Sequence, residues 1–385
     1  MTERSSTRSQ SARSLAKQAG FDLFKTDPFI QDQVLMKENL KGRSVSKVKD
    51  DTSGKVYARK EYIQWNHGND KLVKMIKEEA STITKARHHH IVKCHGYHYI
   101  ENTGLFGLLI RPVAEKNLKE FFGQIEAGRG QDTQDSNRGI MCKWVVCLFD
   151  ALGYLHREKI RHKDIKPSNI LIKGDQIYVA DFGISRNFRD ATTSKTKSQD
   201  PERTERYMAP EIDCDERRGR ATDVWALGCT VLEICTVASG NTIEELNEHL
   251  RQHGRHILFC DTPYYVFDWM LLLLASPGLN PNVAPHIQKI VQLTFLMLDP
   301  KQKKRITMEQ LLHLLGTEDF KSIASLACST CQSTRSYRRQ GLSHSTFNKA
   351  YGGGICIPSK NGISKHTPNL WETIKGRWLS QHMWW

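Results

Sequence analysis

The stretch "RHKDIKPSNILI", Arg161–Ile172, places an unusual set of polar side chains immediately before an apolar run. A carboxylate at Asp164 is followed by an ammonium at Lys166 and an amide at Asn169. The apolar residues Ile170–Ile172 then follow directly, as they would where a strand begins. The sequence therefore predicts a loop that holds a carboxylate, an ammonium and an amide oxygen together at the start of a strand.

A second carboxylate follows in "VADFGIS", where Asp181 precedes a Phe and a Gly. It stands 17 residues after Asp164, and the hairpin-like sequence "ILIKGDQIYVA" between them would return Asp181 to the side of Asn169. Phosphoryl transfer needs a carboxylate for the hydroxyl proton, a carboxylate and an amide for Mg²⁺, and ammonium groups against phosphate charge. The two motifs together supply these parts.

These motifs resemble those of a known family. Three motifs occur in the order of eukaryotic protein kinases: "HKDIKPSN" resembles the catalytic loop, "DFG" the metal loop, and "APE" (Ala209–Glu211) the end of the activation segment. The motif sequences are similar to those of divergent fungal members. The resemblance covers about Val34–Leu315. It implies an α+β, two-lobed protein kinase-like fold with a small β-rich N-lobe and a larger helical C-lobe.

The resemblance also implies roles for the residues of the two loops. Asp164 would accept the proton of the substrate hydroxyl, and Lys166 would contact the transferring γ-phosphate of ATP. Asn169 and Asp181 would hold Mg²⁺ or Mn²⁺. A hydroxyl at Thr204 would bridge Asp164 and Lys166, and together with Lys166 it is similar to the Ser/Thr-directed class.

On the nucleotide side, Lys60 in "YARKEY" resembles the strand lysine that grips the α- and β-phosphates. Its implied partner is Glu79, with Glu78 as the alternative. Further implied contacts to the nucleotide come from Leu40, Val48, Ala58, the gatekeeper Ile110, the backbone of Arg111 and Val113, and Leu171.

Other residues resemble structural positions of the family. Asp223 would brace the catalytic loop, and Glu211 would form a salt bridge with Arg305. An apolar stack between the lobes would consist of Ile83, Cys94, His162 and Phe182. As ordinary core residues, the members of this stack would need no further role.

The phosphate-binding loop departs from the family pattern. Aligned on Leu40 and Val48, "LKGRSVSKV" has Lys41, Arg43 and Ser46 where glycines are expected. Glycines let backbone N–H groups approach phosphates closely, so their loss should weaken the grip on nucleotide. Two functions follow: a kinase that transfers the γ-phosphate of ATP to Ser/Thr hydroxyls of proteins, or a pseudokinase scaffold. The retained polar residues favour the enzyme.

The pattern along the chain predicts four regions. Residues 1–33 form a basic, flexible arm, with a mitochondrial transit peptide as the alternative. Short β-prone runs and one helix, at about Asp70 to Arg87, make an N-lobe over about 34–112. Helical periodicity dominates a C-lobe over about 113–315, after a polar loop at Ala127–Arg138. Residues 316–385 form a basic, mostly disordered tail.

The cysteine and histidine residues bear on the cellular compartment and on metal binding. No secretory signal and ten cysteines without framework spacing favour the reducing cytoplasm or nucleus. Cys328 and Cys331 form a lone CxxC pair, and without a second ligand pair we expect free thiols in a flexible tail. The run "RHHHIVKCHGYH" (Arg87–His98) is not expected to bind metal, because consecutive His residues point in different directions.

The expected partners are ATP and protein substrates. The net charge of +14 is a weak pointer to acidic partners, and without a recognition motif nucleic acid is not expected. No apolar run reaches the roughly 18 residues of a membrane span. The terminal "LWETIKGRWLSQHMWW" mixes Trp with basic residues, so it would either bind a partner or membrane surface, or pack back on the domain.

Overall fold

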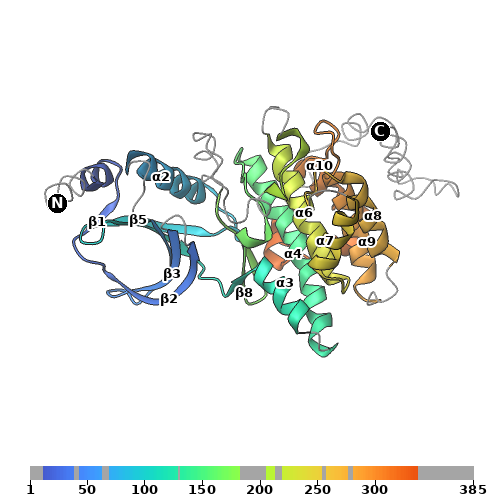
Figure 1. The fold of residues 1–385 in the computed structure, drawn as a ribbon, viewed down its shortest axis with the longest axis horizontal. Coiled ribbons are helices and arrows are strands. Elements are labelled where there is room, and N and C mark those ends of the chain that lie inside the picture. The colour runs from blue at the N-terminus through green and yellow to red at the C-terminus, as the bar shows by residue number, and fades with distance from the viewer. Residues whose placement is uncertain are drawn as a thin grey trace. The chain divides into compact units, whose positions relative to one another are not determined.

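The computed structural model describes residues 12–38, 43–62, 69–128, 131–182, 205–212, 219–253, 257–275 and 281–336. The chain forms two compact units (Figure 1). The first unit comprises residues 1–127 and 154–199, and the second comprises residues 128–153 and 200–385.

The first unit is built on a six-stranded sheet with the strand order β1-β5-β6-β4-β3-β2. All neighbouring strands are antiparallel except the parallel pair β1 and β5. The strand bounds are β1 Asp22–Phe24, β2 Phe29–Glu38, β3 Arg43–Asp50, β4 Val56–Tyr62, β5 Lys93–Ile100 and β6 Leu105–Arg111.

The turn between β3 and β4 shows how local chemistry sets the register of this sheet. The side chain of Asp50 accepts hydrogen bonds from the backbone N–H groups of Thr52 and Ser53, at 2.9 and 2.8 Å. Gly54 has a φ of 66°, which a glycine adopts without steric cost. This turn places Lys60 of β4 opposite Val45 of β3.

Helix α2 (Asn69–Lys85) packs against β5 (Figure 1). Its buried residues recur at helical spacing, from Leu72 and Ile76 through Glu79 to Ile83. The acidic Asp70 and the basic Lys85 occupy the first and last turns, where each complements the helix dipole. The buried face of the helix therefore carries a carboxylate, Glu79, among apolar residues.

The first unit also contains a small three-stranded sheet in the order β7-β8-β9. Its strands are β7 Lys116–Asn117, β8 Ile170–Lys173 and β9 Gln176–Val179, preceded by the short 3-10 helix η1 (Pro167–Asn169). Helix α3 (Leu118–Ala127) follows β7. Asn117 and Glu120 form a reciprocal capping box at its start, with bonds of 2.9 and 3.0 Å.

The units divide at a different place from the lobes that the sequence predicts. The N–H of Val92 donates to the carbonyl of Val179 at 3.1 Å, and the N–H of Val179 donates to the carbonyl of His90 at 2.8 Å. These bonds join the segment before Asp181 to the chain before β5. As a result, the segment 154–199, expected in the C-lobe, belongs to the first unit.

The second unit is helical. Its elements are α4 (Gln131–Arg157, of which residues up to Gly153 belong here), η3 Pro210–Ile212, α6 Arg220–Ala238, α7 Ile243–His253, α8 Pro263–Ala275, α9 Ala284–Met297, α10 Met308–Leu314, η4 Glu318–Phe320, α11 Lys321–Ala324 and α12 Ser329–Ser336. Helix α4 begins inside the expected loop at Ala127–Arg138, which is therefore shorter than the sequence predicts.

Helix α6 is buried along nearly its whole length and packs against α9. At Gly228 a Cβ atom would come within about 3 Å of the side chains of Met297 and Leu298, so only glycine permits this approach. A buried, bidentate ion pair joins Arg305 to Glu211, with N–O distances of 2.7 and 2.9 Å. This pair is the one that the family resemblance implies.

Ordered structure extends beyond the expected domain ends. Residues 12–18 are helical, and β1 and the start of β2 lie within the region 1–33 that the sequence predicts to be flexible. At the other end, η4, α11 and α12 continue to Ser336, and Phe320 and Ile323 are fully buried. Burial of Ala16 and Phe21 in the first segment, and of Phe320 and Ile323 in the second, explains why these segments are ordered. Residues 337–385 lie outside the described residues.

Two helices, Ser136–Arg157 and Arg220–Ala238, are long and apolar enough to cross a membrane, which corrects the expectation that no segment reaches this length. Most of each helix is buried inside the structure, as is usual for core helices, so they are weak signs of a membrane span.

Candidate active site

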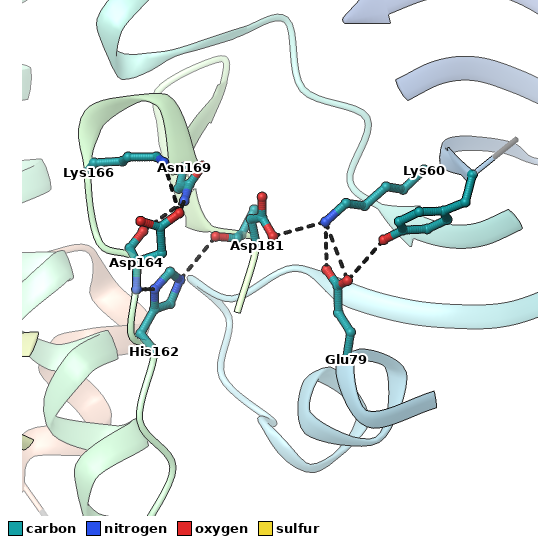
Figure 2. A network of polar contacts seen from close by, with 9 residues as sticks. Lys60, Glu79, His162, Asp164, Lys166, Asn169 and Asp181 are labelled. Atoms are coloured by element: carbon teal, nitrogen blue, oxygen red, sulfur yellow. Dashed lines mark hydrogen bonds and ion pairs between the residues drawn. The ribbon is translucent and has the colours of Figure 1, made fainter. Parts of the chain in front are cut away.

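The catalytic-type loop of the first unit brings Asp164, Lys166 and Asn169 together (Figure 2). The Nδ2 of Asn169 donates to the backbone carbonyl of Asp164 at 2.7 Å and to its Oδ2 at 3.0 Å. The Nζ of Lys166 lies 2.9 Å from the same Oδ2. The predicted cluster is therefore present, and the Oδ1 of Asn169, an acceptor, takes part in neither bond to Asp164.

His162 links this loop to the metal-type loop. Its Nδ1 faces the backbone N–H of Asp164 at 3.3 Å, and its Nε2 lies 3.0 Å from the carbonyl of Ala180. An imidazole whose Nδ1 accepts a hydrogen bond while its Nε2 donates to a carbonyl is neutral, with its proton on Nε2. His162 was expected only as a member of the apolar stack, and this bridging role was missed.

Two residues of these loops have left-handed backbone conformations. Lys163 has a φ of 71° and Asp181 a φ of 60°. Such conformations cost a non-glycine residue on the order of 1–3 kcal/mol and persist only where surrounding contacts hold them. Here the contacts are the His162 bridge and the bond from the Ala180 N–H to the Asn169 carbonyl, at 2.9 Å. These contacts fix the backbone that carries the carboxylates of Asp164 and Asp181.

Lys60 of β4 forms the centre of a second cluster (Figure 2). Its Nζ lies 3.0 Å from Oε1 of Glu79 and 2.9 Å from Oδ1 of Asp181. The hydroxyl of Tyr62 donates to Oε2 of Glu79 at 3.1 Å. The expected partner of Lys60 is thus Glu79, and not the alternative Glu78.

Lys60 and Asp181 stabilise each other's charged forms. Burial alone would lower the pKa of the Lys60 ammonium, but the carboxylates of Asp181 and Glu79 outweigh it and raise that pKa well above its usual value. Burial would likewise raise the pKa of Asp181, yet the Lys60 ammonium holds it below its ordinary value. Lys60 and Asp181 are therefore both charged at neutral pH.

The oxygens of Asp181 and Asn169 suit a hard divalent cation. Oδ1 of Asp181 contacts Lys60, which leaves Oδ2, and the amide oxygen of Asn169 is not used by Asp164. Carboxylate and amide oxygens are the ligands that Mg²⁺ takes in phosphate-binding sites. This donor set fits the metal that the sequence predicts.

Two of the apolar positions expected around the adenine, Ala58 and Ile110, lie opposite each other in the six-stranded sheet. Ala58 of β4 pairs with Ile110 of β6, and Ile110 pairs in turn with Cys94 of β5. Ala58 is buried and Ile110 is half-buried. Arg111 ends β6, and Val113 follows it in the connection to β7. Leu171, on β8, is half-buried between two buried isoleucines.

Val48 does not belong to the face of the sheet that carries Ala58, and its expected contact with nucleotide is wrong. It pairs with Tyr57 and is fully buried in a cluster with Phe29 and Leu109, whereas Ala58 and Lys60 point to the other side of β4. Val45 is the residue opposite Lys60, and it is half-buried. Because side chains alternate along a strand, Val45 occupies the position expected of Val48.

The same correction affects the phosphate loop. Ser46, expected at a glycine position, lies within β3, and its hydroxyl donates to Glu61 at 3.1 Å. Leu40 and Lys41 lie outside the described residues, as does Thr204. The structure therefore gives no geometry for these residues, which the family resemblance implicates.

Sequence reasoning missed a charged network on the opposite face of β4. The guanidinium of Arg59 donates to Glu61 at 2.9 Å and to Asp27 at 2.7 and 2.8 Å, and Glu61 also accepts from Ser44 and Ser46. The only sequence signal for it is the alternation Arg59–Lys60–Glu61, which places the lysine alone on the far side.

The remaining predicted residues are placed as follows. The rings of His162 and Phe182 are 4.8 Å apart, and Ile83 is also buried. Cys94 is half-buried. Asp223 is buried in the first turn of α6 in the second unit, so its expected contact with the catalytic loop stays a prediction.

A family model described as the protein kinase domain matches residues 41–314 of the chain. The chain is 28% identical over 209 residues to mitogen-activated protein kinase kinase kinase 3 of Homo sapiens, a match that covers 49% of this chain and 32% of that protein. It is 27% identical over 251 residues to the serine/threonine-protein kinase Nek1 of Mus musculus, covering 65% of this chain and 20% of that protein.

A third relative is the serine/threonine-protein kinase Nek6 of Oryza sativa subsp. japonica, 30% identical over 157 residues, which are 40% of this chain and 28% of that protein. The chain therefore spans between a fifth and a third of the length of these relatives. The family match extends over most of the chain and includes both polar clusters of the site. With its β-rich sheet, its helical second unit and this match, the chain belongs to the protein kinase family.

Proposed function

We propose that the chain is a serine/threonine protein kinase that transfers the γ-phosphate of ATP to hydroxyl groups of protein substrates. The observation that carries the proposal is the simultaneous presence of two polar clusters in the first unit, Lys60–Glu79–Asp181 and Asp164–Lys166–Asn169. A scaffold that only bound partners would have no need of both.

Each side chain has a role in this reaction. The carboxylate of Asp164 accepts the proton of the attacking hydroxyl, and the adjacent Lys166 ammonium offsets negative charge on the transferring phosphoryl group. Lys60, held by Glu79, binds the phosphates that remain on the nucleotide. Asn169 and Asp181 would hold Mg²⁺, which would neutralise charge on the phosphate oxygens. Positioning and electrostatics thus supply most of the catalysis.

The choice of Ser/Thr over Tyr rests on two observations. Lys166 stands two residues after Asp164, an arrangement that resembles the Ser/Thr-directed class. The names of two relatives also describe serine/threonine-protein kinases. Phosphoamino-acid analysis of the product would check this assignment.

A pseudokinase scaffold is the second candidate, favoured by one feature. No glycine stands at the aligned positions Lys41, Arg43 and Ser46, and glycine backbone N–H groups usually cradle the phosphates. A chain that binds nucleotide weakly or not at all, but keeps its fold, would fit this candidate.

The deciding experiment is transfer of labelled phosphate from ATP, with Mg²⁺ or Mn²⁺, to the chain itself and to generic Ser/Thr protein substrates. Asp164→Asn should abolish incorporation, because an amide cannot accept the hydroxyl proton. Asp175→Asn is the matched control, since Asp175 is an exposed acid in the turn after β8. No incorporation by the unmodified chain, together with no nucleotide binding, would support the scaffold.

A further inference from the structure

Three thiol groups come together in the second unit, one from α4 and two from a CxxC pair about 180 residues further along the chain. Cys147 lies in α4, Cys328 precedes α12, and Cys331 lies within α12. Cys147 and Cys331 are fully buried and Cys328 is half-buried. Cys328 and Cys331, expected to be free thiols in a flexible tail, thus lie in an ordered segment. A third cysteine, Cys147 of α4, lies beside them.

Backbone hydrogen bonds organise these sulfurs. The N–H of Cys331 donates to Sγ of Cys328 at 3.4 Å, and the N–H of Cys328 donates to Sγ of Cys147 at 3.5 Å. Such donors stabilise a sulfur that carries negative charge. In metal sites, hydrogen bonds to the ligand residues orient the atoms that bind the metal. The two N–H groups would do the same for the sulfurs of Cys147 and Cys328.

A carboxylate completes the cluster. Asp150 lies three residues after Cys147 on α4, so the two side chains share one face of that helix. Asp150 is fully buried, and a carboxylate oxygen lies within 4.8 Å of Sγ of Cys331. Sγ of Cys328 is within the same distance of Sγ of Cys331. Cys331 therefore lies beside both Cys328 and Asp150, and Cys328 in turn contacts Cys147 through its N–H.

Binding of a divalent cation would displace the thiol protons to solvent and take the three sulfurs as thiolate ligands.

We propose that Cys147, Cys328, Cys331 and Asp150 form a structural site for a thiophilic divalent cation, Zn²⁺, which fastens the segment containing α11 and α12 to α4. The spacing of Cys328 and Cys331 is that of a zinc-binding pair. Three sulfurs and one oxygen make the four-ligand set of a closed tetrahedral site. The role is structural, and no step of phosphoryl transfer involves this cation.

The first test is the metal content of the full-length chain, purified after expression with zinc in the medium. Elemental analysis should find roughly one zinc ion per chain. The double variant Cys328→Ser/Cys331→Ser should lose it. Cys260→Ser should retain it, since Cys260 is a half-buried cysteine of the same unit whose sulfur contacts Asp261. Zinc retained by the double variant would overturn the proposal.

A second test begins with the unmodified chain, and this first part does not depend on how a variant folds. Metal-stripped protein refilled with Co²⁺ should show the visible absorption of a tetrahedral ion and a thiolate-to-cobalt charge-transfer band. Asp150→Asn should shift the visible absorption, because it replaces a ligand of the metal. It should also weaken zinc binding by more than roughly tenfold, the loss expected for a residue that only orients a ligand. Absence of the charge-transfer band, or a disulfide among the three cysteines in the purified chain, would contradict the site.

Discussion

At the scale of the residue, the site depends on a few side chains whose charges hold each other in place. Lys60 is the clearest, because it contacts carboxylates from a helix and from the metal-type loop, at 3.0 and 2.9 Å. Its loss would leave Glu79 and Asp181 without their shared counter-charge. A buried carboxylate that loses its partner is costly, so the effect should extend beyond a single contact.

We expect Lys60→Met to lower kcat/KM for phosphate transfer by at least about 100-fold, as removal of one preorganised electrostatic donor does. Lys173→Met is the matched control, since Lys173 is an exposed lysine on β8. Initial rates and melting temperatures of both variants check the prediction. A Lys60→Met chain that kept a third or more of the wild-type rate would count against the role of Lys60.

His98 should make the stability of the chain sensitive to acid. It is buried between the Arg59 guanidinium and aromatic rings, and neither ring nitrogen has a hydrogen-bond partner among the described residues. Burial first, and then Arg59, lower the pKa of His98 from 6.5 to about 4, against a smaller opposing effect of Asp27. The unfolded chain therefore binds a proton at higher pH than the folded chain does.

Consequently, the free energy of unfolding should fall as the pH drops from about 6.5 toward 4, by at most about 3 kcal/mol from this residue. His98→Phe should remove that part of the fall, whereas His286→Gln, a half-buried position in the second unit, should not. Urea unfolding at several pH values measures the difference. Parallel pH curves for wild type and His98→Phe would refute this account.

At the scale of the element, the face that a strand presents decides which residues reach the site. Lys60 and Ala58 share one face of β4, while Tyr57, Arg59 and Glu61 share the other. The register of β3 against β4 assigns Val45 to the first face and Val48 to the second. A shift of a single residue would exchange the two sets.

We therefore expect opposite effects from two similar substitutions. Val48→Ala should lower the free energy of unfolding by roughly 1–3 kcal/mol and leave the KM for ATP unchanged, because Val48 is fully buried in the core cluster. Val45→Ala should raise the KM for ATP roughly 3- to 10-fold with little change in stability. The reverse pattern would restore Val48 to the nucleotide face.

This strand also shows how far the sequence alone leads. The two loops were predictable because their polar residues are close in the chain and their spacing is that of the family. Val48 was misplaced because the sequence offers two valines three residues apart, and only long-range pairing of β3 with β4 selects between them. The bridge through His162 was missed because a carbonyl acceptor at Ala180 leaves no trace in sequence.

At the scale of the whole molecule, the kinase-like region does not end where the helical periodicity ends. The sequence places the boundary at Leu315, yet Phe320 and Ile323 are fully buried beyond it. These residues belong to very short elements, which have little periodic signal of their own. Their order comes from burial against the rest of the second unit, which the local sequence does not reveal.

Truncation should reveal this boundary. A chain that ends at Leu315 loses the burial of Phe320 and Ile323, so we expect its free energy of unfolding to fall by about 3–6 kcal/mol. A chain that ends at Ser336 keeps both residues, so its free energy of unfolding should exceed that of the shorter chain by this amount. Thermal and denaturant unfolding of both truncations decides the matter, and equal stability of the two would show that α11 and α12 contribute nothing.

The left-handed backbone at Lys163 limits which residues mutation can place beside the catalytic carboxylate. In saturation mutagenesis, Gly and Asn should be tolerated best, while Val, Ile and Thr should be lost, because β-branched side chains clash at a positive φ. The expected order of tolerated residues depends on the backbone conformation and not on side-chain charge. A tolerance pattern in which Arg surpassed Gly would instead indicate selection for a cation at this position.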